Sequence, residues 1–202
     1  MSTQILLVGD SFAVNHSDPA TNNYGWSFLL EQQYNITNIS QRGVSEYKII
    51  QQLKSINLKK FDCVIVSHTS PNRVYVDQHP VHYLNNDVYS NTDLIYNDIY
   101  WNLKKYPNNA GILAANYYFD KFYNQDYQEF IYQLFQKEIT EMLKNNLTLH
   151  LLTLYDKNID LFQNVINLYQ QIEIDPGNIN HYSAKHNQVV FNLVSNWVNQ
   201  HV

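Results

Sequence analysis

The sequence predicts an α/β fold in which helices cover both faces of a central parallel sheet. Short, continuous apolar runs such as QILLV (4–8) and DCVIVSH (62–68) are typical of strands that are buried on both faces. Segments with helical spacing alternate with these runs, which favours parallel strands joined by helices. The chain has 202 residues and is 45% hydrophobic, so we expect one domain over 1–202 with a full core.

The first half of the chain alternates regularly between helix and strand patterns. Residues 24–34 (YGWSFLLEQQY) have the apolar spacing of a helix, and 34–40 (YNITNIS) are β-branched and alternating, as in a strand. Residues 45–56 form an amphipathic pattern with Ser45 as a plausible N-cap. The buried strand 62–68 follows.

The second half predicts two longer helices. The stronger pattern is 125–146, with a buried stripe expected at Phe130, Leu134, Ile139 and Leu143. A strand is expected at 147–155 (LTLHLLTLY), and a last helix at 183–200 with Ser183 as its N-cap. The core positions expected on this last helix are Val189, Val190, Leu193, Val194 and Trp197.

Residues 71–112 interrupt this rhythm with three prolines and many Tyr and Asn residues. Within them, 93–106 has a pattern compatible with a helix. The segment is longer than a connection between a strand and a helix requires. It is either a lid or specificity insertion, or a surface excursion that packs on itself.

Composition narrows the class of protein. The net charge is −5 and no Lys/Arg-rich run occurs, so we expect no nucleic-acid partner. MSTQILLV has no basic start and too short an apolar run for a signal peptide or a membrane span, so we expect a cytoplasmic protein, with association with a virion as the alternative. The apolar run around Cys63 (FDCVIV) predicts that its thiol lies in the core. The 17 tyrosines reflect either AT-rich codons or a carbohydrate-facing surface.

Four polar clusters lie where chemistry is expected. Ligands of an open parallel sheet bind beyond the carboxyl ends of its strands. Three clusters follow predicted strands, and the fourth precedes the last helix. They are 9–11 (GDS), 41–43 (QRG), 68–73 (HTSPNR) and 178–181 (NINH).

In these clusters the chain resembles the SGNH (GDSL-type) hydrolases over roughly residues 4–200. LLVGDSF matches the first block of that family, with Ser11 at the nucleophile, and RGVS supplies the glycine of the second block, Gly43. SHTSPNR offers Asn72 for the third block at looser spacing, and NINHYSAKHN places His181 before the last helix. The resemblance implies a three-layer flavodoxin-like sandwich and an esterase that needs no cofactor.

The chemistry of these residue types agrees with the resemblance. A serine hydroxyl needs a base within hydrogen-bond reach, and the imidazole of His181 titrates near neutral pH. The oxyanion needs donors directed at the developing charge. The expected donors are the N–H groups of Ser11 and Gly43 and the amide of Asn72, with Thr69 or Ser70 as alternatives to Asn72.

Asn178 departs from the family pattern, which has an aspartate three residues before the histidine. A Ser-His pair with weaker support is one explanation, since an amide orients an imidazole without adding charge. A second is that Asp175 orients His181 from across the Pro-Gly turn. The third is a degraded site in a non-catalytic binding protein.

The leading hypothesis is a serine esterase that acts on a small ester or an O-acetyl group of a carbohydrate. The rival is an inactive binding or structural protein with the same fold, for example a component of a phage particle. A flavodoxin-like cofactor binder is a third reading, but with 5 glycines the chain has no Gly-rich phosphate loop.

The remaining polar residues give weaker signals. His79 and His82 are closely spaced, but no cysteine or acidic residue stands at a recognisable interval, so we expect no metal site. His181 and His186 do not share a helix face well. Arg73 either binds an anionic group of the substrate or pairs with an acidic residue of the 71–112 segment.

Overall fold

The computed structural model describes residues 3–18, 22–83, 89–172 and 182–202. Its centre is a five-stranded sheet, with every pair of neighbouring strands parallel, in the order β4-β1-β5-β6-β7. The strands are β1 (Gln4–Gly9), β4 (Asn35–Asn38), β5 (Cys63–His68), β6 (Leu147–Leu152) and β7 (Val165–Asn167). A small antiparallel ribbon pairs β2 (Ser17–Asp18) with β3 (Asn23–Tyr24).

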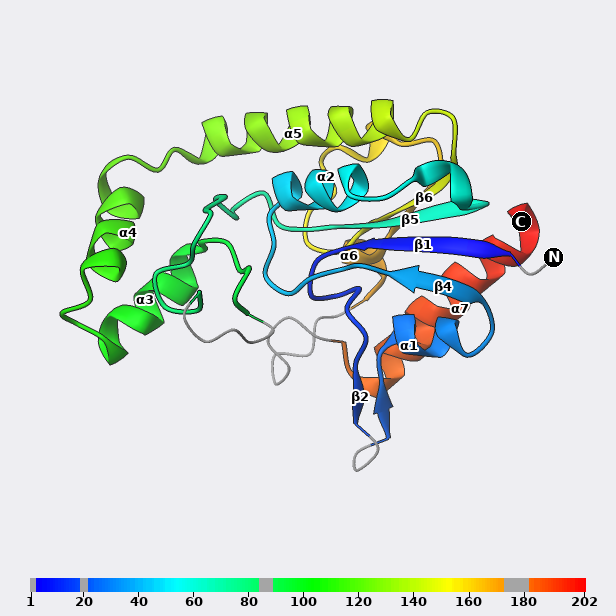
Figure 1. The fold of residues 1–202 in the computed structure, drawn as a ribbon, viewed down its shortest axis with the longest axis horizontal. Coiled ribbons are helices and arrows are strands. Elements are labelled where there is room, and N and C mark those ends of the chain that lie inside the picture. Colours follow the sequence, from blue (N-terminus) through cyan, green and yellow to red (C-terminus); the bar gives the residue numbers. More distant parts are fainter. Residues whose placement is uncertain (1–2, 19–21, 84–88, 173–181) are drawn as a thin grey trace.

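Helices cover both faces of the sheet (Figure 1). One face packs against α2 (Glu46–Lys54) and α5 (Gln125–Met142), and the other against α1 (Trp26–Glu31) and α7 (Ala184–His201). Shorter helices are α6 (Leu168–Gln171) and the 3-10 turns η1 (Leu58–Lys60) and η2 (Ile159–Leu161). The α/β prediction and the flavodoxin-like three-layer arrangement are confirmed.

The continuous apolar strands supply both core layers because successive side chains point to opposite faces. Ile5 and Leu7 of β1 belong to the layer under α1 and α7, whereas Leu6 and Val8 belong to the layer under α2 and α5. All four side chains are fully buried. The continuous apolar run at residues 4–8 therefore predicted a central strand correctly.

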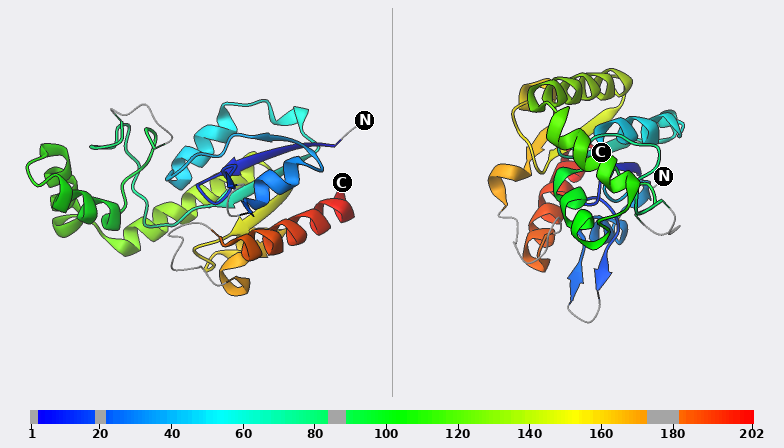
Figure 2. Two further views of the ribbon diagram at one scale, coloured as in Figure 1. Left: turned by 90° about the horizontal axis from the view of Figure 1, so that it is seen from below. Right: turned by 90° about the vertical axis from the view of Figure 1, so that its left-hand side faces the viewer.

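The described residues 71–83 and 89–124 form an extension that projects from the ends of the strands, to one side of the sheet (Figure 2, left). It contains α3 (Tyr96–Lys105) and α4 (Ala110–Lys121), and Val74 pairs with Leu94 at its base. Its own apolar cluster is built around Ile99 and Ile112, both fully buried. The extension thus packs partly on itself, and α4 carries it beyond the boundary at residue 112 that we expected from the sequence.

The expected stripe of α5 is wrong in its first half. Phe130 and Leu134 are 54% and 43% exposed, whereas Tyr132 and Gln136 are buried. Tertiary partners explain the rotation: the Tyr132 hydroxyl donates to the Thr69 carbonyl at 2.8 Å, and a Gln136 oxygen accepts from Asn158 at 2.7 Å. Phe130 and Leu134 are exposed because the helix turns Tyr132 and Gln136 toward these partners.

Of the two N-caps predicted from the sequence, the one at Ser183 forms and the one at Ser45 does not. The Ser183 hydroxyl accepts from the His186 N–H at the start of α7, as predicted. Ser45 stands at the N-cap of α2, but its side chain makes no capping bond, and its N–H donates to an Asp93 oxygen at 2.7 Å. No described helix is long and apolar enough to cross a bilayer.

Candidate functional site

The loops after β1, β4 and β5 leave the same edge of the sheet. β1 lies between β4 and β5, and all three strands run in the same direction. The Gln41 N–H donates to the Gly9 carbonyl at 3.0 Å, so the loop after β4 starts directly beside the Gly-Asp-Ser turn. The expectation that these clusters gather at one edge is therefore met for the loops that the structure describes.

Gly9 is held too tightly for any side chain. A Cβ on it would lie 2.6 Å from the carbonyl oxygen of Ser67, and its φ is +154°. The Gln52 side chain bonds to both backbone groups of Gly9. It accepts from the Gly9 N–H at 2.9 Å and donates to the Gly9 carbonyl at 3.1 Å. The turn that carries Ser11 therefore starts from a rigid point.

Asp10 shapes this turn from inside the molecule. Its side chain is fully buried, and Oδ1 accepts from the Phe12 N–H at 3.1 Å. Burial raises the pKa of the carboxyl group to about 6, against the opposing effect of the Arg73 guanidinium. The Asp10 carboxyl group therefore stabilises the turn through the Phe12 N–H, and it takes up a proton at a higher pH than an exposed aspartate does.

Ser11 lies at the mouth of a very small pocket. Its side chain is 7% exposed, and neither Oγ nor the backbone N–H has a hydrogen-bond partner among the described residues. The pocket has a volume of about 10 Å³, room for about one water. It is lined by Ser11, Phe12, Val14, His16, Gly25, Tyr182 and Asn187.

His181, Asn178 and Asp175 all lie outside the described residues. The first described residue after them is Tyr182. It lines the Ser11 pocket, and its ring packs on Phe12 with centroids 5.0 Å apart. The start of the C-terminal helix segment is therefore adjacent to the Gly-Asp-Ser turn in space, although 171 positions separate Ser11 from Tyr182 in the sequence.

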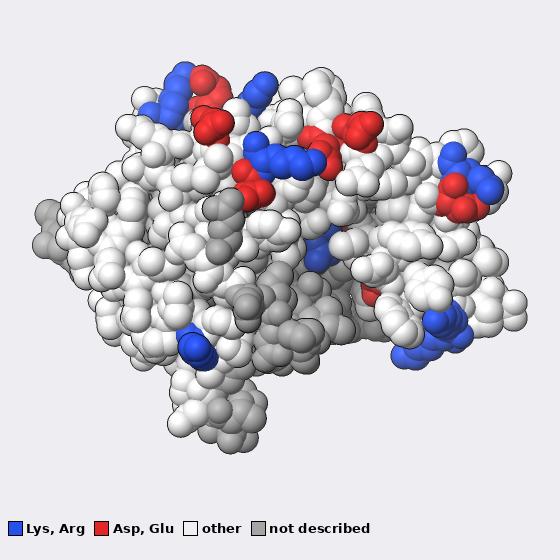
Figure 3. All heavy atoms as spheres, turned by 180° about the vertical axis from the view of Figure 1, so that it is seen from behind, with Lys and Arg blue, Asp and Glu red and all other residues white. Residues whose placement is uncertain are grey.

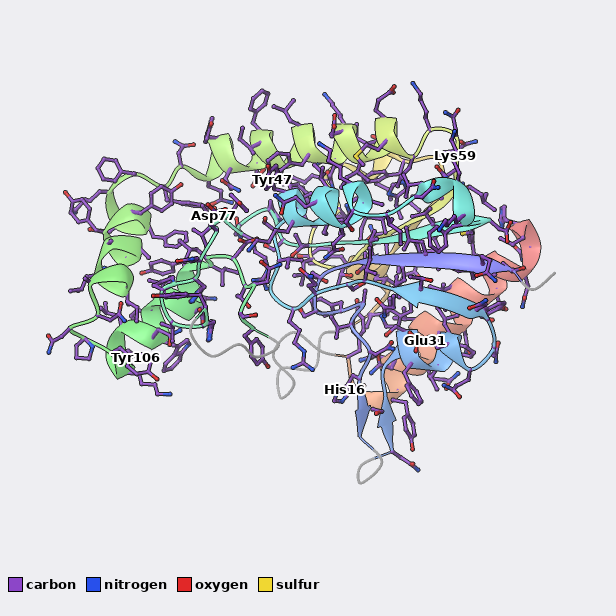
Figure 4. The ribbon with its side chains drawn as sticks, viewed as in Figure 1. His16, Glu31, Tyr47, Lys59, Asp77 and Tyr106 are labelled. Atoms are coloured by element: carbon purple, nitrogen blue, oxygen red, sulfur yellow. The ribbon has the colours of Figure 1, made fainter. Side chains whose placement is uncertain are left out.

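His16 is a residue of this pocket that the sequence did not single out. It precedes β2, at the foot of the ribbon (Figure 4). Its carbonyl accepts from the Gly25 N–H at 2.8 Å, which closes the ribbon against the pocket. Only its position five residues after Ser11 hinted at this, and such proximity along the chain is a weak signal.

Gly43 takes the left-handed conformation, with φ +68°, and packs against the extension. A Cβ here would lie 2.6 Å from Cγ2 of Thr92. Its carbonyl accepts from Arg73 at 3.1 Å and from the Asp93 N–H at 2.9 Å. Its own N–H makes no hydrogen bond to a described residue, so it remains available as a donor.

Asn72 and Ser11 line different pockets. It is exposed, and its Oδ1 accepts from the Tyr123 hydroxyl at 3.1 Å. It lines a pocket of about 390 Å³ whose residues are entirely different from those of the Ser11 pocket. The lining residues are Asn72, Ile95, Tyr96, Asn97, Phe119, Tyr123 and Gln125.

Thr69 and Ser70, the alternatives to Asn72, differ in accessibility. Thr69 is buried at 1% exposure, and its N–H donates to Glu46 at 3.3 Å. Ser70 is half-buried, and its hydroxyl accepts from the Asn72 N–H at 3.2 Å. Arg73, next to them, is buried and tied to Gly43, and its charge acts on Asp10.

A buried Glu46–His68–His150 chain runs under this edge of the sheet. His68 Nδ1 donates to a Glu46 oxygen, and Nε2 lies 2.9 Å from His150 Nδ1. All three side chains are at most 4% exposed. Burial and the neighbouring His68 lower the pKa of His150 to about 2, which keeps its ring neutral. The sequence signal was a histidine in the otherwise apolar strand LTLHLL.

The opening above Glu46 is the third notable pocket. It has a volume of about 250 Å³ and also contains Arg73 and Tyr132. Each oxygen of the Glu46 carboxylate accepts one hydrogen bond, from His68 and from the Thr69 N–H, and the side chain is 2% exposed. We read this chain as a satisfied polar network that supports the loop after β5.

No protein-family model matches this chain, and no curated protein matches it significantly.

Proposed function

We propose that this protein is a serine hydrolase of the SGNH type that cleaves an ester bond. The observation that carries the proposal is the set of unpartnered groups at one edge of the sheet. The Ser11 hydroxyl and the N–H groups of Ser11 and Gly43 have no hydrogen-bond partner among the described residues. A nucleophile and two backbone donors are what acyl transfer requires.

In the proposed reaction, Ser11 Oγ attacks the ester carbonyl while His181 takes the hydroxyl proton. The N–H groups of Ser11 and Gly43 stabilise the oxyanion. The tetrahedral intermediate collapses, and the alcohol leaves with the proton from His181. Water then attacks the acyl-serine with His181 as base and releases the acid. Asn178 or Asp175 orients the imidazole.

The pocket beside Asn72 supports an acetylated carbohydrate as the substrate class. Its walls combine the rings of Tyr96, Phe119 and Tyr123 with three side-chain amides, and they include no Asp, Glu, Lys, Arg or His. Aromatic faces and amides suit a neutral sugar, and about 390 Å³ lies within the usual range for small-molecule sites. On the face seen in Figure 3, the Lys, Arg, Asp and Glu side chains are sparse and their two signs are intermixed.

The nucleophile is tested with a fluorophosphonate probe at neutral pH. We expect the wild type to be labelled and Ser11→Ala to remain unlabelled. Ser27→Ala is the matched control, because Ser27 is also buried with an unpartnered hydroxyl. Absence of labelling in a folded wild-type sample would contradict the proposal, as would labelling that persists in Ser11→Ala.

The base is tested by turnover of p-nitrophenyl acetate. We expect His181→Ala to reduce kcat by at least about a hundredfold, the size of a general-base contribution. His186→Ala is the control, since His186 lies at the start of α7 and bonds to Ser183. Equal rates for wild type and His181→Ala would remove His181 from the mechanism.

A non-catalytic binding or structural protein, such as a component of a phage particle, is the second candidate function. The small volume beside Ser11, about 10 Å³ among the described residues, favours it, and so does Asn178 in place of an aspartate. This candidate predicts a folded protein that binds a neutral glycan but neither reacts with the probe nor hydrolyses the ester.

A further inference from the structure

His79, His82 and Asp98 converge inside the extension. The two histidines lie in the segment between Val74 and Leu94, which pair with each other, and Asp98 lies in the first turn of α3. Asp98 Oδ2 is 3.0 Å from His79 Nε2 and 3.7 Å from His82 Nε2. The three candidate ligand atoms lie within 4.8 Å of one another. The acidic partner that the sequence pattern lacked therefore comes from a helix sixteen residues further on.

The His79 and Asp98 side chains are in direct contact. The distance of 3.0 Å between His79 Nε2 and Asp98 Oδ2 is that of an ion pair, and both atoms are buried. A cation that displaces the proton between them would meet both atoms.

The Asp98 carboxylate is held in place by its own helix. Its Oδ1 accepts from the Asn102 amide at 3.0 Å, which orients the carboxylate. An oriented carboxylate beside two imidazoles is a common ligand set for zinc.

We propose that His79, His82 and Asp98 bind a divalent cation of the zinc class, such as Zn²⁺, Co²⁺ or Ni²⁺. Tetrahedral bonds of about 2.0–2.1 Å place neighbouring ligand atoms about 3.3–3.4 Å apart. The observed 3.0 and 3.7 Å bracket this value, so small side-chain adjustments suffice. Two imidazoles disfavour Ca²⁺ and Mg²⁺, which prefer oxygen ligands.

The proton on His79 limits the affinity. A metal on Nε2 requires the ring proton on Nδ1, yet Nδ1 now accepts from the N–H groups of Val81 and His82 at 3.3 and 3.4 Å. These long contacts must be given up, and the turn must shift, when the metal binds. We therefore expect micromolar affinity, weaker than in sites where Nδ1–H donates to a carboxylate or carbonyl.

The site joins the turn at 79–82 to α3, so its ion stabilises the extension. It shares no residue with the Ser11 pocket. The proposal consequently stands or falls independently of the esterase activity.

Binding is measured on the full chain after treatment with EDTA, by calorimetric titration with ZnCl₂ and by the visible spectrum with CoCl₂. We expect one equivalent of zinc, a tetrahedral Co²⁺ spectrum and a higher Tm with zinc. His82→Ala and Asp98→Asn should weaken binding at least about tenfold, as expected for the loss of one ligand or its charge. These two are preferred to His79→Ala because His79 is fully buried and its loss endangers folding.

Two matched variants serve as controls. His201→Ala removes an exposed histidine that bonds only to its own helix, and Asp120→Asn removes an exposed carboxylate paired with Lys121. Both should retain wild-type zinc binding. The proposal is overturned if the folded wild type takes up no zinc at millimolar concentration, or if His82→Ala and Asp98→Asn bind as tightly as the controls.

Discussion

His150 Nδ1 lies 2.9 Å from His68 Nε2, and the His150 ring stacks on Phe162 with centroids 4.1 Å apart. His68 donates its Nδ1–H to Glu46 in this arrangement. Its unprotonated Nε2 then accepts from His150 Nδ1–H. The tautomers of both rings are thereby set by one buried carboxylate. This arrangement makes His150 a neutral group that resists protonation.

The first prediction concerns acid sensitivity. The pKa of His150 is about 2 in the folded chain, against about 6.5 for an exposed histidine, so the unfolded chain binds more protons between these values. The free energy of unfolding should therefore fall as pH drops below 6.5, by up to about 1.4 kcal/mol per pH unit.

His150→Leu should remove this part of the slope, and it should cost about 1–3 kcal/mol at neutral pH because the His68 nitrogen loses its partner. Urea unfolding between pH 7.5 and 4.5 measures both effects. His201→Asn serves as the exposed control. An unchanged slope in His150→Leu would show that another group causes the acid sensitivity.

The second prediction concerns Asp10 and has the opposite sign. Its pKa is raised from 3.8 to about 6, so the folded chain holds a proton that the unfolded chain has lost. The contribution of Asp10 is fully present below pH 3.8 and is lost as pH rises through 6. Over that range the loss is at most about 3 kcal/mol.

Asp10→Asn keeps an oxygen for the Phe12 N–H and does not titrate. Its free energy of unfolding relative to wild type should therefore improve as pH rises from 4 to 7, when measured by urea unfolding at each pH. A difference that is independent of pH would mean that Asp10 titrates normally.

The third prediction tests the close contact at Gly43. Gly43→Ala should cost about 1–3 kcal/mol, because an alanine at φ +68° is strained and its Cβ would overlap Thr92 Cγ2. Thr92→Ser removes that methyl group. In a double-mutant cycle, the alanine should be less destabilising in the Thr92→Ser background. Additive effects would show that backbone strain alone accounts for the cost.

The fourth prediction concerns the attachment of the extension. Buried Asp93 accepts from the N–H groups of Ser45 and Val76 and pairs with Lys48 at 2.8 Å. Asp93→Ala leaves the Lys48 charge buried without its carboxylate, which should cost about 3–5 kcal/mol. Asp120→Asn, which breaks an exposed pair, should cost less than about 1 kcal/mol.

Hydrogen exchange locates the effect. In Asp93→Ala, amides of α3 and of the Val74–Leu94 pairing should exchange faster than those of β1 and β5. Uniform acceleration throughout the chain would indicate that the extension and the sheet unfold as one unit.

Local patterns identified most of the layered fold. β1, β5 and β6 were recognisable because strands buried on both faces are mostly apolar, and α7 was marked by its Ser183 cap and its spacing. β7, with three residues, is too short to produce a period. α4 was missed because its apolar residues surround the helix rather than forming one stripe.

The order of strand and helix patterns along the chain was enough to predict a parallel sheet with Ser11 and Gly43 in loops at one edge of it, because strands joined by helices run in the same direction. Only the tertiary structure decided that Glu46, His68 and His150 form a chain, with neighbours 22 and 82 residues apart, and that Asp98 meets His79 and His82. Such contacts depend on how distant elements pack, and no spacing along the chain encodes that packing.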